Sequence, residues 1–229
     1  MAKRPIFIPI SGFPYVEELF LEFEWVPGFA KSQAQKSISS LHSAAARQGI
    51  SPVLEISSKS SNPLGLSLSA FNLTLNVETD KAISVECAFQ GSKIFERGGP
   101  YNDLYFAQSK DAKTDYRIRT SGSIIRFSFC GEEFPIEPIR AFYDWLYITA
   151  LWQNNSLSSR LMAYKGFSDI AFNPKKSWNC QAHSAALFVS LSQMGILEPA
   201  MQDKDYFISL VTNRGTQAKP KGKQLKLEY

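Results

Sequence analysis

Leu19-Phe20-Leu21-Glu22-Phe23-Glu24-Trp25 is a stretch with apolar side chains at its odd positions and two glutamates between them. A period of two predicts a β-strand with one buried face. Residues 31–48 contain no proline or glycine, and their apolar side chains recur at helical spacing. We expect a helix there that ends at Gly49, because glycine readily adopts the left-handed conformation of a helix terminus. A strand followed by an amphipathic helix indicates a fold that mixes both elements.

The rest of the chain continues this mixture. Strands are expected at residues 6–10, 15–25, 52–57 and 66–77, with a hairpin of residues 116–120 and 123–130 and at most a short strand at 170–172. Further helices are expected at residues 83–95, 135–153 and 182–194. Because some strands are consecutive and others are separated by helices, this order predicts the α+β class rather than a doubly wound parallel sheet.

Length and composition favour one domain. With 229 residues, of which 44% are hydrophobic, the chain can bury one sizeable core. We expect residues 1–212 to form that domain, and residues 213–229, rich in lysine, glutamine, glycine and proline, to be a mobile basic tail. The formal net charge of +4 is compatible with a polyanionic ligand without requiring one.

Cysteine and histidine usage argues against a metal site. The three cysteines stand far apart, and no cysteine or histidine pair has the spacing of zinc ligands. We expect no metal and a reducing compartment. Prolines interrupt the apolar residues near the N-terminus, and the most hydrophobic window, residues 142–152, is shorter than the roughly 20 residues of a membrane-spanning helix. The sequence therefore predicts a cytoplasmic protein without a membrane partner.

Polar residues gather in four segments, residues 37–42, 57–60, 89–93 and 168–181. Hydroxyls, amides and lysines around apolar walls suit a nucleotide pocket, although serine and asparagine in such segments also form ordinary caps and turns. The chain has neither a GxGxxG motif nor a P-loop motif, and neither histidine has an evident serine or cysteine partner. The residues alone indicate a ligand-binding α+β domain.

Three blocks give the chain a resemblance to a known family. Residues 89–93 (FQGSK), 142–147 (FYDWLY) and above all 167–182 (FSDIAFNPKKSWNCQA) resemble the DarT family of DNA ADP-ribosyltransferase toxins, in its guanine-directed branch. The resemblance implies a split mixed sheet of the ADP-ribosyltransferase type with flanking helices. It also implies transfer of ADP-ribose from NAD, as co-substrate, to a base of single-stranded DNA, guanine rather than thymine. The chain would be the toxin of a phage-defence pair, with a cognate antitoxin that carries an ADP-ribosyl-removing domain.

The resemblance implies a catalytic glutamate at the position where this chain has Ala171. A carboxylate there would stabilise an oxocarbenium-like ribose and help to deprotonate the incoming base nitrogen. Two explanations of the alanine are open. One is replacement of the glutamate to inactivate a toxin that kills its host. The other is a natural inactive homologue, or an acid elsewhere, for example Glu55, Glu86 or Asp169.

The remaining site residues are assigned from the same resemblance. Those expected to hold NAD are His42, Ser57, Lys59, Ser60, Ser69, Asn72, Gln90 and Lys93. Those expected to contact nucleic acid are Lys175, Lys176, Trp178 and Gln181. Lysine suits a phosphate contact, and tryptophan can stack on a base. An alternative of another class stays open, in which Ala171 is native and the chain is a non-catalytic module that binds a nucleotide or a nucleic acid.

Overall fold

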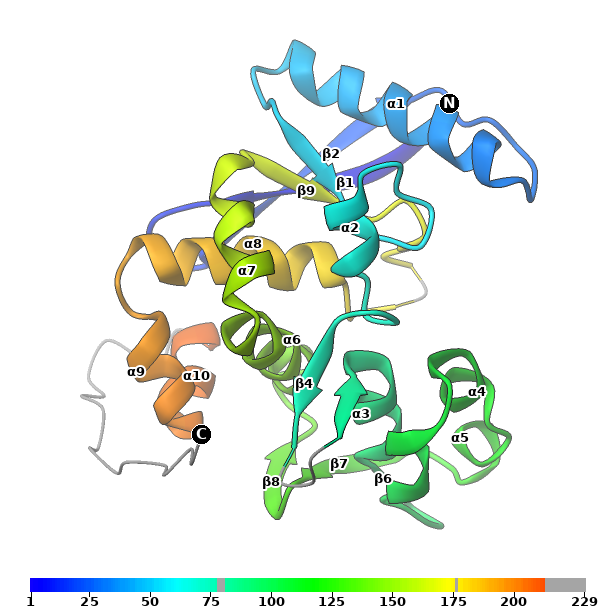
Figure 1. The fold of residues 1–229 in the computed structure, drawn as a ribbon, viewed down its shortest axis with the longest axis vertical. Coiled ribbons are helices and arrows are strands. Elements are labelled where there is room, and N and C mark those ends of the chain that lie inside the picture. The colour runs from blue at the N-terminus through cyan, green and yellow to red at the C-terminus, as the bar shows by residue number, and fades with distance from the viewer. Residues whose placement is uncertain (78–80, 176, 213–229) are drawn as a thin grey trace.

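Strands from distant parts of the chain form a four-stranded mixed sheet in the computed structural model, which describes residues 1–77, 81–175 and 177–212 (Figure 1). The strand order is β2 (Val16–Phe23), β1 (Ala2–Pro9), β9 (Gly166–Ser168) and β3 (Val53–Glu55). Strand β1 runs antiparallel to β2 and to β9, whereas β3 and β9 are parallel. The parallel pair therefore brings two carboxyl ends of strands to the same edge.

Helices cover both faces of this sheet. Helix α1 (Lys31–Arg47) packs on one face, where Ile6 of β1 joins Leu41 in a small core cluster. Helix α8 (Gln181–Gln193) packs on the other face, where Phe7 and Phe167 join the main core. Neighbouring residues of β1 thus point to opposite faces, as the pleat of a strand requires. In Figure 1, α1 lies at the top and α8 crosses the middle of the molecule.

A second group of strands lies at the other end of the molecule. Strands β4 (Thr74–Asn76) and β5 (Ala82–Ser84) pair antiparallel, and so do β6 (Lys93–Phe95), β7 (Ile124–Phe129) and β8 (Glu132–Pro135). Helix α6 (Ala141–Gln153) connects the two groups, because its residue Phe142 stacks on Phe127 with ring centres 4.5 Å apart while the helix also packs on α8. Helix α3 (Val85–Gly91) packs beside α6.

Short helices complete the described chain. They are α2 (Pro63–Ser67), η1 (Asn102–Phe106), α4 (Ser109–Thr114), α5 (Arg117–Thr120), α7 (Asn155–Ser158), η2 (Ser159–Ala163), α9 (Leu197–Gln202) and α10 (Lys204–Val211). Within the described ranges, no helix combines the length and the apolar character needed to cross a bilayer.

The α+β prediction is confirmed, and so are the strands near residues 6–10, 15–25 and 52–57 and the helices near residues 31–48 and 182–194. Residues 135–153 are helical only from Ala141. The ADP-ribosyltransferase type of sheet stays a prediction. The expected tail, residues 213–229, lies outside the described residues.

Four other predictions are wrong. Residues 66–77 are not one strand, because Asn62 caps α2 with Pro63 at its first position. The helix at 83–95 is shorter, since it ends at Gly91 and residues 93–95 form β6. Residues 116–120 contain α5, and β7 turns instead into β8. The short strand of this region is Gly166–Ser168 rather than 170–172.

Candidate functional site

Two carboxylates lie where the parallel strands β3 and β9 end. Glu55 is the last residue of β3 and is paired in register with Ser168, the last residue of β9. Asp169 follows directly. The carboxyl ends of parallel strands are the usual place for ligand sites in α/β sheets, because the chain leaves the sheet there and exposes polar groups.

Asp169 is held by three hydrogen-bond donors. The backbone N–H groups of Ala171 and Phe172 donate to its Oδ1 at 3.0 and 3.2 Å, and Nε2 of Gln181 donates to its Oδ2 at 3.0 Å. Burial, and next the charge of Glu55, raise the pKa of the Asp169 carboxyl to about 7, although these donors favour its ionised form. The side chain keeps partial exposure to solvent. Asp169 can therefore exchange a proton near neutral pH.

A second polar group follows one side of α3 and the start of β6. Gln90 Nε2 donates to Glu86 Oε1 at 2.8 Å, and Lys93 Nζ donates to Gln90 Oε1 at 2.6 Å. All three side chains are buried. The ammonium of Lys93 also lies 4.5 Å from the ring centre of Phe89. Burial lowers the pKa of Lys93 to about 8, in spite of the opposing charge of Glu86.

Backbone contacts of Ala70 connect the two groups. Its N–H donates to Gln181 Oε1 at 2.7 Å, and its carbonyl accepts the N–H of Glu86 at 2.9 Å. The ring of Tyr143 packs edge-on against that of Phe89, with ring centres 5.2 Å apart. Burial, and next the charges of Glu86, Tyr147, Cys180 and Asp169, raise the pKa of its phenol well above the ordinary value. We name Glu86, Gln90, Lys93, Tyr143, Asp169 and Gln181 the acid–lysine cluster.

Glu55 is buried behind Asp169 and accepts three hydrogen bonds. Ser57 Oγ donates to its Oε1 at 2.7 Å, Ile170 N–H donates to the same oxygen at 2.8 Å, and Ser168 Oγ donates to its Oε2 at 2.5 Å. His42 Nε2 lies 2.8 Å from Ser168 Oγ. Burial raises the pKa of the Glu55 carboxyl, and burial lowers the pKa of His42 to about 4, so the imidazole is neutral at physiological pH.

Ser69 supplies a hydroxyl without a partner. Its Oγ is buried and has no hydrogen-bond partner in the part of the chain that the structure describes. Ser69 lies between Ala70, which contacts Gln181, and Leu68, whose carbonyl accepts the Tyr147 hydroxyl at 2.6 Å. An unsatisfied buried hydroxyl is costly unless a ligand or water pairs with it. Ser69 is therefore suited to hydrogen-bond a ligand.

The structure brings some predicted site residues together and leaves others apart. Ser69, Gln90, Lys93 and Gln181 lie in or beside the acid–lysine cluster, and His42 and Ser57 connect to it through Glu55. Lys59 contributes its backbone N–H to Ser57, and Ser60 accepts the N–H of Asn62 within the same loop. Asn72 is exposed and donates to the carbonyl of Leu66. The assigned roles of all these residues stay predictions.

The segment after Asp169 is largely on the surface. Lys175 is exposed, and Trp178 is 60% exposed, whereas Lys176 lies outside the described residues. Ala171 is exposed on a turn, where its N–H binds Asp169. The position expected to hold a glutamate therefore supplies a backbone donor to an acid two residues earlier.

Sequence reasoning named Glu55, Glu86 and Asp169 only as alternatives and missed Tyr143 and Tyr147. Asp144 was a visible signal in the same hydrophobic block, because an acid in an apolar helix needs a partner; it is buried and accepts a bond of 2.5 Å from Ser184. Nothing in the sequence pattern distinguished the two tyrosines from ordinary core residues of α6. Their significance comes from α3 packing against that helix and from their electrostatic interaction with Asp169.

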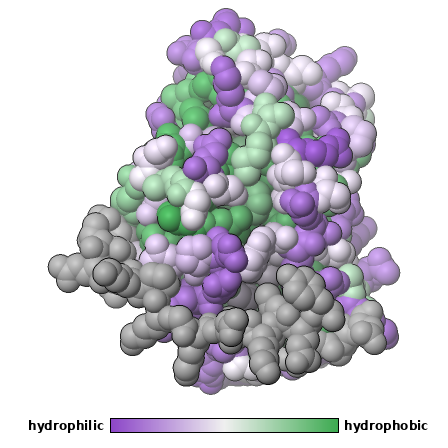
Figure 2. Space-filling view, turned by 60° about the vertical axis from the view of Figure 1, so that its left-hand side comes forward, coloured by the Kyte–Doolittle hydropathy of each residue, from purple (hydrophilic) through white to green (hydrophobic). Residues whose placement is uncertain are grey.

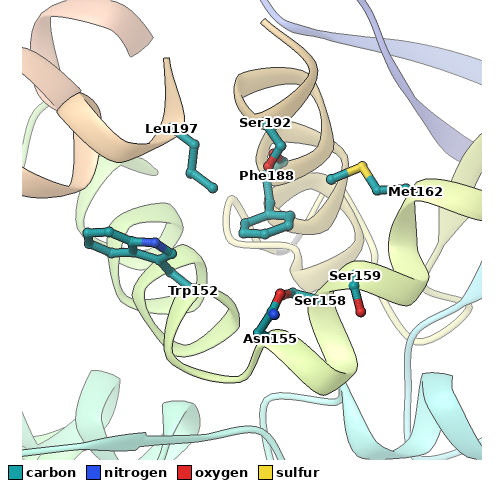
Figure 3. A pocket seen from close by; sticks show the side chains of 8 residues that line it. All are labelled: Trp152, Asn155, Ser158, Ser159, Met162, Phe188, Ser192 and Leu197. Atoms are coloured by element: carbon teal, nitrogen blue, oxygen red, sulfur yellow. The ribbon is translucent and has the colours of Figure 1, made fainter. Parts of the chain in front are cut away.

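A spacious hollow lies elsewhere on the molecule. A cavity of about 530 Å³ opens among α6, α7, α8 and α9, where Trp152, Phe188 and Leu197 point into the same space (Figure 3). The face turned forward in Figure 2 shows hydrophobic surface between hydrophilic side chains. Among the described residues, those that line this cavity carry no ionisable side chain. We therefore base the candidate site on the acid–lysine cluster, where ionisable groups are present.

In the described ranges, no three histidine, cysteine, aspartate or glutamate side chains are grouped so that they could hold a metal ion. Two described side chains titrate near neutrality, the carboxyl of Asp169 with a pKa of about 7 and the ammonium of Lys93 with a pKa of about 8. Groups with such pKa values are suited to general acid–base catalysis at neutral pH.

Comparison with known proteins corrects the interpretation of the sequence. A family profile described as "DarT1-associated NADAR antitoxin" matches residues 2–221. No curated protein matches the chain significantly. The match is to the antitoxin of a toxin–antitoxin pair, so the resemblance to the DarT toxin was wrong, and so were the assignments as a DNA ADP-ribosyltransferase and as an inactivated toxin with a replaced glutamate at Ala171. The alternative of a non-catalytic binding module gains no support from it.

Proposed function

We propose that this chain, which belongs to the DarT1-associated NADAR antitoxin family, hydrolyses the bond between ADP-ribose and a DNA base. It would thereby reverse the modification made by a toxin of the DarT type. The observation that carries this proposal is the acid–lysine cluster, which contains a carboxyl and an ammonium group with pKa values near neutrality and the buried Tyr143, whose ring packs against the Phe89 ring that Lys93 also faces. Perturbed pKa values in one cluster are typical of catalytic sites.

An antitoxin can act by binding its toxin or by undoing the toxin's product. Binding requires a complementary surface, and buried ionisable groups would add nothing to it. Burying Glu86 and Lys93, and partly burying Asp169, costs desolvation free energy that an apolar core would avoid. A chain that keeps such groups beside an unsatisfied Ser69 hydroxyl is better explained by reversal of the modification.

The proposed reaction is hydrolysis of a glycosidic bond. Asp169 takes a proton from water, the water oxygen bonds to C1 of the ribose, and the bond from C1 to the base nitrogen breaks with its electron pair going to nitrogen. The Lys93 ammonium donates a proton to that nitrogen. Proton exchange with solvent then returns Asp169 to its ionised form and Lys93 to its ammonium form. The products are ADP-ribose and the unmodified base.

Glu86 supports this step electrostatically. An oxocarbenium-like ribose develops positive charge, and a carboxylate fixed by Gln90 is placed to stabilise that charge without reorganising. Gln90 also binds Lys93, so that one amide orients the carboxylate and the proposed proton donor together. The Ser69 hydroxyl would pair with a hydroxyl or phosphate oxygen of the ADP-ribosyl group.

In this proposal the ADP-ribosyl group of modified DNA takes the place that the sequence suggested for NAD. The nucleic-acid assignment of Lys175, Lys176 and Trp178 is retained as part of the proposal. The exposure of Lys175 and Trp178, on the segment between Asp169 and α8, supports it. A phosphate contact and a stacked base beside the cluster would hold the modified strand. The only support for an ADP-ribosyltransferase type of sheet is the resemblance to the toxin family.

Neutralisation in cells tests the proposal. A DarT1-type toxin is co-expressed with this chain or with its Asp169→Asn variant, and adducts on DNA are counted by mass spectrometry. Reversal predicts growth and few adducts with the native chain, and toxicity with abundant adducts with Asp169→Asn at equal protein level. If Asp169→Asn protects cells as well as the native chain does, neutralisation works by binding and the proposal fails.

A further inference from the structure

We propose that Glu55 is a positioning residue for Asp169, which it fixes from both sides of the backbone while placing a second carboxyl group beside it. This inference rests on the proposed function, because Asp169 is the proton acceptor of the proposed reaction. The role is distinct from that of the acid–lysine cluster. Glu55 is 3% exposed and lies behind Asp169, so it does not need to touch the substrate.

The clamp consists of two hydrogen bonds to the neighbours of Asp169. Ser168 Oγ, on the preceding residue, donates to Glu55 Oε2 at 2.5 Å, and the N–H of Ile170, on the following residue, donates to Oε1 at 2.8 Å. Asp169 stands between these two anchors. Residues held by buried charge-assisted hydrogen bonds lose little freedom at the moment of reaction, which is what preorganisation of a catalytic group requires.

His42 extends the clamp toward solvent. Because Ser168 donates to Glu55, its oxygen accepts the hydrogen from His42 Nε2, at 2.8 Å, which defines the Nε2–H tautomer. The imidazole of α1 is only partly buried. The order His42, Ser168, Glu55 therefore resembles a catalytic triad in composition but not in use, since His42 donates to the serine oxygen instead of accepting its proton, which goes to Glu55.

Ionisable groups from several elements interact electrostatically with Asp169. They are Glu55 at the end of β3, Tyr143 and Tyr147 of α6, and Cys180, the residue before α8. Of these four side chains, that of Glu55 carries a carboxyl group. Two nearby carboxyls do not ionise independently, so the rising limb of the pH profile belongs to the pair. Removing the charge of Glu55 must lower the pH at which Asp169 ionises.

The experiment compares the native chain with Glu55→Gln by two readouts. Carboxyl-carbon NMR follows the titration of Asp169 directly, and the pH profile of kcat follows hydrolysis of ADP-ribosylated DNA. We expect the Asp169 midpoint and the rising limb to move to lower pH by about one unit, and kcat to fall about tenfold with KM changed less than about twofold. Glu132→Gln, which removes a glutamate from an exposed ion pair with Lys204, is the matched control and leaves the midpoint in place.

Ser57→Ala is the second variant in case Glu55→Gln does not fold. It removes one donor to Glu55, which makes that carboxyl easier to protonate, and it moves the Asp169 midpoint in the same direction by a smaller amount. An unmoved midpoint in the folded variants overturns the inference, and so does a loss of stability without any change of kcat or pH profile. If the native chain hydrolyses no adduct, the proposed function fails, and the NMR midpoint still decides the relation between Glu55 and Asp169.

Discussion

Gln181, the first residue of α8, donates from its Nε2 to Asp169 Oδ2 at 3.0 Å while its Oε1 accepts the N–H of Ala70 at 2.7 Å. The same nitrogen also donates to the carbonyl of Ile56 at 2.7 Å. One amide thus joins the end of β3, the segment before β4 and the carboxyl that follows β9. The assignment of Gln181 to nucleic-acid binding stays a prediction, and its side chain contacts the proposed proton acceptor.

Replacing Gln181 with leucine is expected to remove a donor to the Asp169 carboxylate. The pKa of Asp169 then rises, because a hydrogen bond to the charged form is lost, and the rising limb of the pH profile of kcat moves to higher pH. This direction is opposite to that expected for Glu55→Gln. The unpaired Ala70 N–H costs about 1–3 kcal/mol of unfolding free energy, which urea denaturation measures. A limb that stays in place would show that Gln181 does not control Asp169.

Asp169→Asn is expected to lower kcat by about 100-fold or more, because a general base is lost. The same substitution is expected to raise the stability of the fold above neutral pH, although it lowers activity. The folded-state pKa of Asp169 is raised, so the native fold favours the protonated carboxyl, and its contribution to stability falls as pH rises from about 4 through about 7. At about pH 8 the variant should be more stable than the native chain by about 1–2 kcal/mol.

The comparison of thermal unfolding at about pH 5 and about pH 8 checks that sign, because the stability difference should shrink at the lower pH. A variant that is equally destabilised at both values would mean that the hydrogen bonds of the carboxylate outweigh its desolvation.

Lys93→Arg tests whether Lys93 acts as a proton donor or only as a positive charge. Arginine keeps the charge and stays protonated at all accessible pH values, so it cannot release a proton near neutrality. We expect Lys93→Arg to be as inactive as Lys93→Ala, and the falling limb near pH 8 to disappear from any residual activity. Substantial activity in Lys93→Arg, with a normal falling limb, would assign the proton donor elsewhere.

Trp178→Ala is expected to weaken binding of single-stranded DNA. Stacking of a base on an exposed aromatic ring contributes about 1–3 kcal/mol, so the dissociation constant should rise about tenfold while that of free ADP-ribose stays the same. Trp25→Ala is the matched control, because Trp25 is also exposed but follows β2. Fluorescence anisotropy with a labelled oligonucleotide measures both variants. Equal DNA affinity of the two variants would place the DNA contact away from Trp178.

Local sequence signals predicted those elements in which pattern and packing agree. The alternation around Phe23 and the periodicity from Ile38 to Leu41 each describe one buried face, and both elements formed as predicted. The prediction failed where the chain changes element within a few residues. The turn at Cys130 and Gly131 has φ values of 49° and 79°, which is a hairpin conformation. Cysteine is not a typical residue for such a turn, so β8 was not predicted.

The candidate site was predictable only in parts for a related reason. Gln90 and Lys93 were identified within one block, because their spacing is local. Their spatial relation to Asp169 is a property of the tertiary fold. It depends on the bond from Ala70 to Gln181 and on the packing of α3 against α6. The chain was assigned to the toxin instead of the antitoxin because that resemblance rested on short blocks, whereas the matching profile covers residues 2–221.

Hydrolysis of the bond between ADP-ribose and the DNA base can be tested with purified components and no toxin present. An oligonucleotide that carries one ADP-ribosylated guanine is incubated with the native chain, and both the oligonucleotide and the released nucleotide are followed by mass spectrometry. If the chain hydrolyses the adduct, the oligonucleotide returns to its unmodified mass while an equal amount of ADP-ribose appears, and Asp169→Asn leaves the adduct intact. An adduct that persists with the native chain, under conditions in which that chain binds the oligonucleotide, would show that the chain does not hydrolyse it.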